Sequence, residues 1–159
     1  MSTALYAGSF NPFTKGHLDI VVRGLALFDR VVIGIGCNVS KEDTARQSAE
    51  IFGHIAALFG CTDRVEVCRY QGLTCDFATA LGADCLLRGA RSAADFEYER
   101  TMADANRMLS GLDTVILPAR PELSMVSSSM VRELRHFGRD TSEFEVSPED
   151  VAKELLKKH

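Results

Sequence analysis

Long apolar runs are missing from this sequence of 159 residues. No stretch approaches the roughly 20 consecutive apolar residues that a membrane-spanning helix needs. The N-terminal segment has no basic residues ahead of an apolar run, so we do not expect a signal peptide. An excess of positive charge is also missing, because 18 basic and 22 acidic residues give a net charge of −4. We therefore expect no membrane and no nucleic-acid partner, and a bound polyanion would need a few well-placed cations and backbone amides.

Paired cysteine motifs are missing too. The cysteines are odd in number and form no C-x-x-C pair, which argues against both a zinc site and a disulfide framework. We interpret them as small apolar residues in the reduced state, which favours a cytoplasmic location. They are Cys37, Cys61, Cys68, Cys75 and Cys85.

Short β-branched runs alternate with longer helical patterns along the chain. Strands are expected near residues 3–7, 30–36, 64–68, 84–87 and 114–117. Helices are expected near residues 17–28, 44–59, 74–81, 92–109 and 127–136, with a last one from Pro148. This alternation predicts an α/β fold with a doubly wound, five-stranded parallel sheet and right-handed crossovers. No repeat or long linker divides the sequence, so we expect residues 1–159 to form a single domain.

Two local signals mark helix ends. Gly82 follows the helical pattern of residues 74–81 and is typical of a C-cap. Ser92 precedes Asp95 by three residues, which resembles a capping box with Asp in place of the usual Glu or Gln.

Ligands of doubly wound sheets bind beyond the carboxyl ends of the strands. The loops to examine are therefore residues 8–16, 37–43, 70–74, 88–92 and 118–128. The first of them lies in Y-A-G-S-F-N-P-F-T-K-G-H at residues 6–17, which lacks both the G-x-G-x-x-G motif and the P-loop motif. It places His17 at the start of a helix, whose free N–H groups attract phosphate. A plain helix-start turn with an exposed histidine remains the alternative, and the charge of His17 stays open.

Cations stand in two of the other loops. Lys41 follows a buried strand, and alone it would be read as a surface residue. Arg88 and Arg91 flank Gly89 at the end of an apolar strand, and guanidinium groups bind phosphate in bidentate fashion. A carboxylate of the following helix, Asp95 or Glu99, could orient Arg91 or accept from a ribose hydroxyl. We expect anion binding here.

Three consecutive serines stand at the start of the helix expected over residues 127–136. One of them is explained as an N-cap. Together, the hydroxyl and amide donors of Ser127, Ser128 and Ser129 suit a polyphosphate tail.

These motifs, taken together, resemble the phosphopantetheine adenylyltransferase family, which belongs to the nucleotidyltransferase superfamily with the H/T-x-G-H signature. The resemblance rests on T-x-G-H at residues 14–17, R-G-x-R at 88–91, D-F-E-Y-E at 95–99 and the serine run opening residues 127–133. It extends over nearly the whole chain. It implies a Rossmann-like nucleotidyltransferase fold and transfer of AMP from ATP to 4′-phosphopantetheine, which gives dephospho-coenzyme A and pyrophosphate. It also implies Mg²⁺ as cofactor and a homohexamer.

The resemblance assigns roles by position. Catalysis would fall to His17 and Lys41, at the α-phosphate. Phosphopantetheine would be held by Ser9, Lys41, Thr74 and Arg88. ATP would be held by Ser9, Phe10, His17, Gly89, Ala90, Arg91, Glu99, Leu123, Ser124, Met125, Val126, Ser127, Ser128 and Ser129. Because the nucleophile is a phosphate that is already ionised at pH 7, no general base is needed, and catalysis consists of positioning and charge stabilisation.

Some positions depart from the family pattern. The family loop usually reads G-T-F-D-P, and residues 8–12 read G-S-F-N-P. Thr74 stands where an apolar residue is frequent, and Leu123 stands where an aromatic residue can occur. Two alternatives are weighed. One is a sister enzyme that transfers a cytidylyl group, or adenylates nicotinamide mononucleotide, although those families commonly show H-x-G-H. The other is a non-catalytic nucleotide-binding module.

Overall fold

The computed structural model describes residues 1–37 and 42–157 of the chain. Its five strands form one parallel sheet in the order β3-β2-β1-β4-β5, which confirms the expected doubly wound α/β fold. The strands are β1 (Thr3–Gly8), β2 (Arg30–Gly36), β3 (Val65–Tyr70), β4 (Cys85–Ala90) and β5 (Asp113–Pro118). The helices are α1 (Lys15–Leu27), α2 (Glu42–Leu58), α3 (Thr74–Leu81), α4 (Ala93–Ser110), α5 (Ser128–His136) and α6 (Pro148–Leu156), with short 3-10 turns η1 (Pro121–Leu123) and η2 (Ser142–Phe144).

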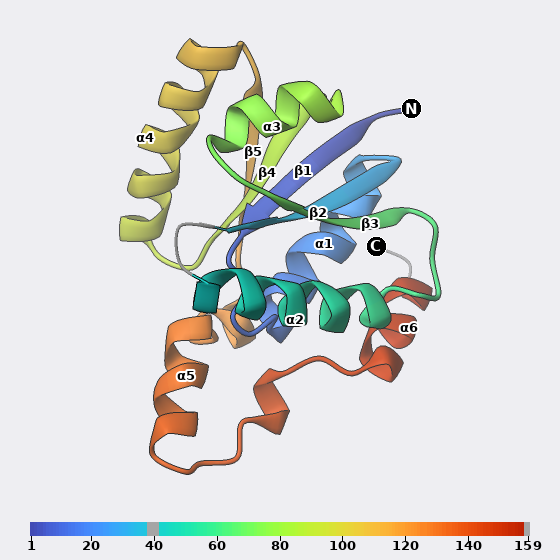
Figure 1. Cartoon of the computed structure of the whole chain (residues 1–159), viewed down its shortest axis with the longest axis vertical. Helices are drawn as coiled ribbons and strands as arrows, with labels where there is room; N and C mark the ends of the chain where they lie inside the picture. Colours follow the sequence, from blue (N-terminus) through green and yellow to red (C-terminus); the bar gives the residue numbers. More distant parts are fainter. Residues whose placement is uncertain (38–41, 158–159) are drawn as a thin grey trace.

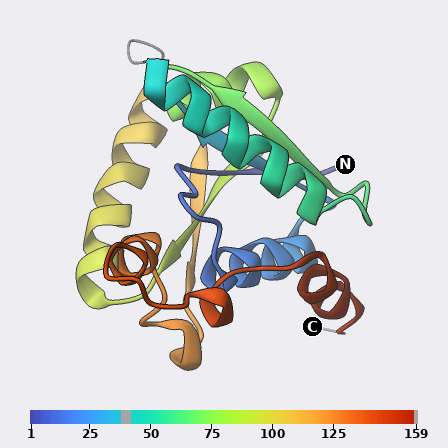
Figure 2. The ribbon, with the colours of Figure 1, turned by 60° about the horizontal axis from the view of Figure 1, so that its bottom comes forward.

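Helices cover both faces of the sheet (Figure 1). The helices α1 and α2 lie on one face and α3 and α4 on the other, as right-handed crossovers require when the chain reverses direction at the middle of the sheet. The segment that follows α5 passes across the start of α1 before it enters α6 (Figure 2). An isolated antiparallel bridge between Thr14 and Glu145 fastens it there. None of the described helices is long and apolar enough to cross a bilayer.

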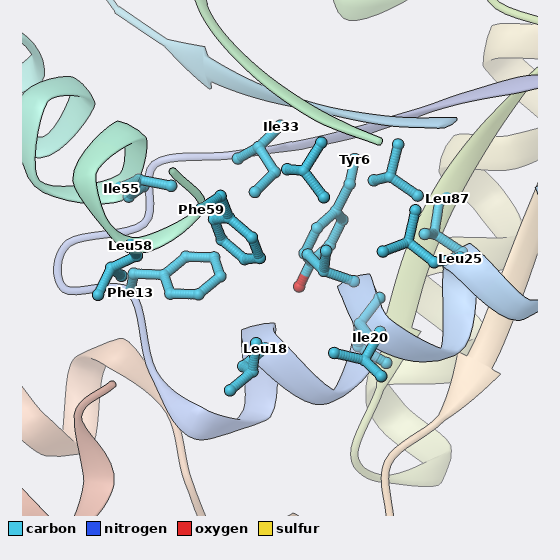
Figure 3. Packing of buried hydrophobic residues seen from close by; sticks show 14 of the residues in the cluster. Tyr6, Phe13, Leu18, Ile20, Leu25, Ile33, Ile55, Leu58, Phe59 and Leu87 are labelled. Carbon is cyan, nitrogen blue, oxygen red and sulfur yellow. The ribbon is translucent and has the colours of Figure 1, made fainter. Parts of the chain in front are cut away.

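Strand side chains alternate between two hydrophobic cores. Tyr6 and Ile33 point toward α1 and α2 and pack in one cluster with Phe59, as Figure 3 shows. Their sequence neighbours Leu5 and Val32 point to the opposite face and pack under α3. Because both faces of the central strands are buried, those strands read as continuous apolar runs.

Two element boundaries differ from the sequence-based expectation. The first helix begins at Lys15 rather than at His17, because Thr14 acts as its N-cap. The fourth strand was expected to end at Leu87, with Arg88 in a loop, and this was wrong. It continues to Ala90 because it keeps pairing with β5, with Arg88 opposite Ile116.

The two predicted helix-end signals have different outcomes. Gly82 is confirmed as a C-cap, with the left-handed backbone that glycine adopts without steric cost. Ser92 is confirmed as an N-cap that accepts a hydrogen bond from the Asp95 N–H at 3.1 Å. The Asp95 carboxylate does not complete the capping box, because it accepts from the Arg91 N–H at 3.1 Å instead of the Ser92 N–H.

The sheet opens between its two central strands. Pairing of β1 with β4 ends at Tyr6 and Leu87, whereas β1 stays paired with β2 to Gly8 and β4 stays paired with β5 to Ala90. This gap lies where the strand order reverses, which is the usual ligand position in doubly wound sheets.

Candidate active site

A crevice of about 400 Å³ lies at the gap between β1 and β4. Its walls come from the loop after β1, the end of β4, the first turns of α4 and the region from η1 into α5. The sequence-predicted residues that line it are Ser9, Phe10, His17, Arg88, Gly89, Ala90, Arg91, Glu99, Leu123, Val126, Ser127, Ser128 and Ser129. Of the other predicted residues, Thr74 lines an adjoining cavity, Ser124 and Met125 belong to the same loop as Leu123, and Lys41 lies outside the described residues.

His17 is fixed in one tautomer by the cap of α1. The backbone N–H of Thr14 donates to His17 Nδ1 at 2.9 Å, and the Thr14 hydroxyl accepts from the His17 N–H at 3.4 Å. Because Nδ1 is the acceptor of that hydrogen bond, the proton of the neutral imidazole must be on Nε2. His17 therefore offers a single N–H donor from the ring edge opposite the cap.

Aromatic rings surround the imidazole on its inner side. The ring centroid of Phe10 lies 5.0 Å from that of His17, Phe13 lies at 5.4 Å and Tyr6 at 6.3 Å. Burial among these rings, and then the charges of Arg91 and Arg88, lower the pKa of His17 to about 3. His17 is therefore neutral at neutral pH when no ligand is bound, whereas the sequence left its charge open.

Arg88 is the central cation of the crevice, and its side chain is already engaged. Its Nε and Nη2 donate to the two carboxylate oxygens of Glu99, each at 2.8 Å, and Nη1 donates to the Ala7 carbonyl. Burial opposes the charge of Arg88, but the hydrogen bonds and charge of Glu99 outweigh it and raise the pKa of Arg88. The bidentate edge that the sequence suggested for phosphate is therefore occupied, and a phosphate would bind the remaining N–H groups.

Arg91 is held in a similar way by the helix that follows it. Its Nε lies 3.3 Å from the Asp95 carboxylate, which also accepts from the Arg91 backbone N–H. The interpretation that a carboxylate of α4 orients Arg91 is thus confirmed for Asp95. Glu99 is committed to Arg88 instead.

The three serines at the start of α5 use their hydroxyls within the protein. Ser127 caps the helix by accepting from the Met130 N–H at 3.1 Å, and Ser128 donates to the Pro12 carbonyl at 2.8 Å. Ser129 accepts from Arg132 at 3.1 Å. What this turn chiefly offers an anion is therefore its first backbone N–H groups, those of Ser128 and Ser129, together with the positive end of the helix dipole.

Two features in or near the crevice were missed by the sequence analysis. Asp19 on α1 forms ion pairs with Arg23 at 3.0 Å and with Arg120 at 2.8 Å, and Arg23 donates to the Pro118 carbonyl at 2.8 Å. This cluster fastens the start of the η1 loop to α1. Arg132, from the second turn of α5, also lines the crevice. Arg132 lies within the serine-run motif of residues 127–133, but the sequence analysis gave it no role.

A second cavity of about 270 Å³ adjoins the crevice. Arg88 and Glu99 line both spaces, so their ion pair stands between them. The second cavity has an apolar and amide lining that includes Leu73, Met102 and Asn106, and Thr74 is part of it. Two ligands, one in each space, would meet at Arg88.

The glycines of the site also serve the fold. A Cβ on Gly89 would lie 3.0 Å from the Ile20 side chain of α1. The absence of a side chain at Gly89 therefore lets α1 pack against β4, in addition to leaving the backbone open to a ligand as the sequence suggested. A Cβ on Gly8 would lie 3.2 Å from the ring of Phe10, whose backbone has φ 50°.

Within residues 1–37 and 42–157, no group of three or more His, Cys, Asp or Glu side chains could form a metal cage. The crevice carboxylates Asp95 and Glu99 are both paired with arginines. Its donors are neutral or cationic N–H groups, which suits the stabilisation of phosphate oxygens.

The chain is similar to known proteins over most of its length. A family model described as cytidylyltransferase-like matches residues 5–134. A protein of Porphyromonas gingivalis named phosphopantetheine adenylyltransferase is 52% identical over 143 residues, covering 89% of this chain and 92% of that protein. A protein of Phocaeicola vulgatus with the same name is 46% identical, covering 91% and 95%. A solved structure from Francisella tularensis, a bifunctional NMN adenylyltransferase/ADP ribose pyrophosphatase, superposes with a TM-score of 0.64 at 14% identity and covers 99% of this chain and 50% of that one.

Proposed function

Because this chain belongs to the cytidylyltransferase-like family and, within it, to the phosphopantetheine adenylyltransferases, we propose that the crevice at the gap between β1 and β4 is where its reaction takes place. The reaction transfers the adenylyl group of ATP to 4′-phosphopantetheine and gives dephospho-coenzyme A and pyrophosphate, a step of coenzyme A biosynthesis. The single observation that carries the assignment of the crevice is the neutral His17, fixed with its proton on Nε2.

His17 is the donor for the α-phosphate in this proposal. As the acceptor phosphate attacks the α-phosphorus, negative charge grows on the non-bridging oxygens, and the Nε2–H stabilises it by a hydrogen bond. No proton has to be removed from the nucleophile, so a histidine that cannot readily be protonated is suited to the role. Lys41, which lies outside the described residues, would add a positive charge at the same phosphate.

The two adjoining cavities support an arrangement for the two substrates. ATP occupies the crevice that contains Phe10, His17 and the start of α5, and phosphopantetheine occupies the second cavity with Thr74. The acceptor phosphate reaches Arg88 at the boundary, with Ser9 as a further hydroxyl donor. Glu99 holds Arg88 in place and so acts as a positioning residue.

The β- and γ-phosphates leave as pyrophosphate from the outer part of the crevice. Arg91 and the first N–H groups of α5 bind them there, while Leu123 and Val126 line the wall beside them. We propose Mg²⁺ as the cofactor, which would offset charge on the leaving group when the nucleotide is bound. The crevice carboxylates Asp95 and Glu99 are both paired with arginines, so neither would be its main ligand.

We further propose a cytoplasmic enzyme that assembles as a homohexamer. Apolar side chains that are exposed on the single chain support assembly, including Met108 and Leu109 on α4, which are 82% and 61% exposed. Light scattering of the purified protein tests the number of copies.

Pyrophosphate release from ATP, with and without 4′-phosphopantetheine, tests the proposed function. We expect release that depends on the acceptor, and little release when CTP replaces ATP or when nicotinamide mononucleotide replaces phosphopantetheine. Release that prefers either replacement would point to a sister enzyme. Binding of ATP with no release for any acceptor would point to a non-catalytic module.

A further inference from the structure

The segment between α5 and α6, residues 139–146, crosses the start of α1 (Figure 2), and we call it the strap. Its residue Glu145 forms the isolated antiparallel bridge with Thr14. The next residue, Val146, is buried in the same hydrophobic cluster as Phe13. Thr14 is only 1% exposed. The strap is therefore anchored in the core and paired with the residue that caps α1.

Three side chains lock the strap to the end of α5. One carboxylate oxygen of Glu145 accepts from the guanidinium group of Arg135, in the last turn of α5, and the other accepts from the Thr141 hydroxyl at 2.8 Å. Arg135 Nε donates to the same hydroxyl at 3.3 Å. Each side chain thus contacts the other two, which restricts Glu145 to one arrangement. The ion pair is partly exposed, so its main effect is on geometry and not on stability.

The residue that the strap holds is the one that fixes His17. The Thr14 N–H donates to His17 Nδ1 from an extended backbone, with φ −109° and ψ 169°. Pairing with Glu145 in a β-bridge requires the same extended backbone at Thr14. An N-cap by itself favours one arrangement by only about fivefold. The strap therefore narrows the orientations of the His17 ring further than the cap does alone.

We propose that Glu145, locked by Arg135 and Thr141, is a positioning residue for adenylyl transfer, which holds Thr14 so that the His17 Nε2–H keeps its aim at the α-phosphate. This inference rests on the proposed function, in which His17 is the donor. In the described part of the chain, none of these three locking side chains lines the crevice. Loosening the strap should therefore slow transfer without weakening ATP binding.

The test compares single-turnover transfer, ATP binding by calorimetry, and the nitrogen-15 NMR spectrum of the His17 ring, assigned by its absence in His17→Asn. Glu145→Leu removes both acceptor oxygens, and Glu145→Gln keeps one. Thr141→Val removes the buried hydroxyl at similar volume and is the second variant, should Glu145→Leu fail to fold. Glu143→Leu is the matched control, because Glu143 is an exposed carboxylate of the same strap.

Glu145→Leu should lower the transfer rate by about tenfold, because the donor is no longer held in line. ATP affinity should change by less than about twofold. The His17 spectrum should change from a single tautomer with the proton on Nε2 to an average of both tautomers. Thr141→Val should act in the same direction, Glu145→Gln should recover part of the rate, and Glu143→Leu should match wild type.

An unchanged His17 spectrum in both Glu145→Leu and Thr141→Val would overturn the inference, whatever the rate. Equal losses of rate and ATP affinity, or the same losses in Glu143→Leu, would also overturn it, because they would show that the strap only supports folding. If wild type showed no acceptor-dependent transfer, the proposed function would fall. The His17 spectrum needs no substrate, so it separates that failure from a failure of the strap to hold the ring.

Discussion

Protonation of His17 should oppose folding, and this effect can be isolated with one substitution. The native ring has a pKa of about 3, against 6.5 for a free histidine, because it is buried among aromatic rings and faces two arginines. Below about pH 6.5 the unfolded chain binds a proton at position 17 that the native chain does not bind until about pH 3. The unfolded state therefore binds more protons in this window, and the free energy of unfolding falls as the pH is lowered.

The size of the effect follows from the window. Each pH unit between the two pKa values is equivalent to about 1.4 kcal/mol. Between about pH 7.5 and pH 5, His17 should thus lower the free energy of unfolding by about 2 kcal/mol. Other histidines and carboxylates titrate over the same range, so the wild-type curve alone does not isolate this contribution.

His17→Asn removes the titrating group while its side-chain oxygen can still accept from the Thr14 N–H. Urea unfolding of both proteins at about pH 7.5, 6.5, 5.8 and 5 gives the difference in free energy of unfolding, wild type minus variant, at each pH. That difference should become about 2 kcal/mol less favourable to wild type by pH 5. A flat difference would mean that His17 has the same pKa in the native and the unfolded protein, and the lowered pKa of the buried ring would be wrong.

Two further predictions concern packing and the wall of the crevice. Gly24→Ala should lower the free energy of unfolding by about 1–2 kcal/mol, because its Cβ would lie 2.6 Å from buried Leu87. Gly53→Ala has open space around it and should raise the free energy of unfolding by up to about 1 kcal/mol. Equal effects of the two substitutions in urea unfolding would contradict the packing of Gly24. Asp19→Asn should weaken the ion pair with Arg120 and so loosen the η1 loop. The KM for ATP should rise by about threefold to tenfold, with kcat nearly unchanged. An unaltered KM in steady-state kinetics would refute the role of Asp19 in holding this loop.

Much of the fold was predictable because it depends on local pattern. The strand over Arg30–Gly36 and the helix over Thr74–Leu81 agree with the sequence-based boundaries, since continuous apolar runs and a C-cap glycine are local signals. The end of β4 was not predictable in this way. Arg88 and Gly89 are atypical of strands, and only their pairing with β5, which is a tertiary contact, keeps the chain extended.

The site was predictable in its location and less so in its contacts. Topology brings the ends of the strands together, so the loops with His17 and Arg91 line one crevice as expected. The sequence could not show that Glu99 occupies the bidentate edge of Arg88, because that choice depends on how α4 packs against β4. Arg132 was missed because its contact with Asn11 joins two segments that lie 121 residues apart in the sequence. Substrate contacts of all these residues stay predictions.

The central claim is that the His17 Nε2–H stabilises the α-phosphate during transfer. The most direct measurement is single-turnover transfer by His17→Asn, which keeps the cap of α1 and lacks this donor, alongside ATP binding by the same variant. The rate should fall by about 10²-fold or more with ATP affinity almost unchanged, and His17→Gln, whose amide can reach toward the position of Nε2, should recover part of the rate. An intact rate with weakened ATP binding would contradict the claim.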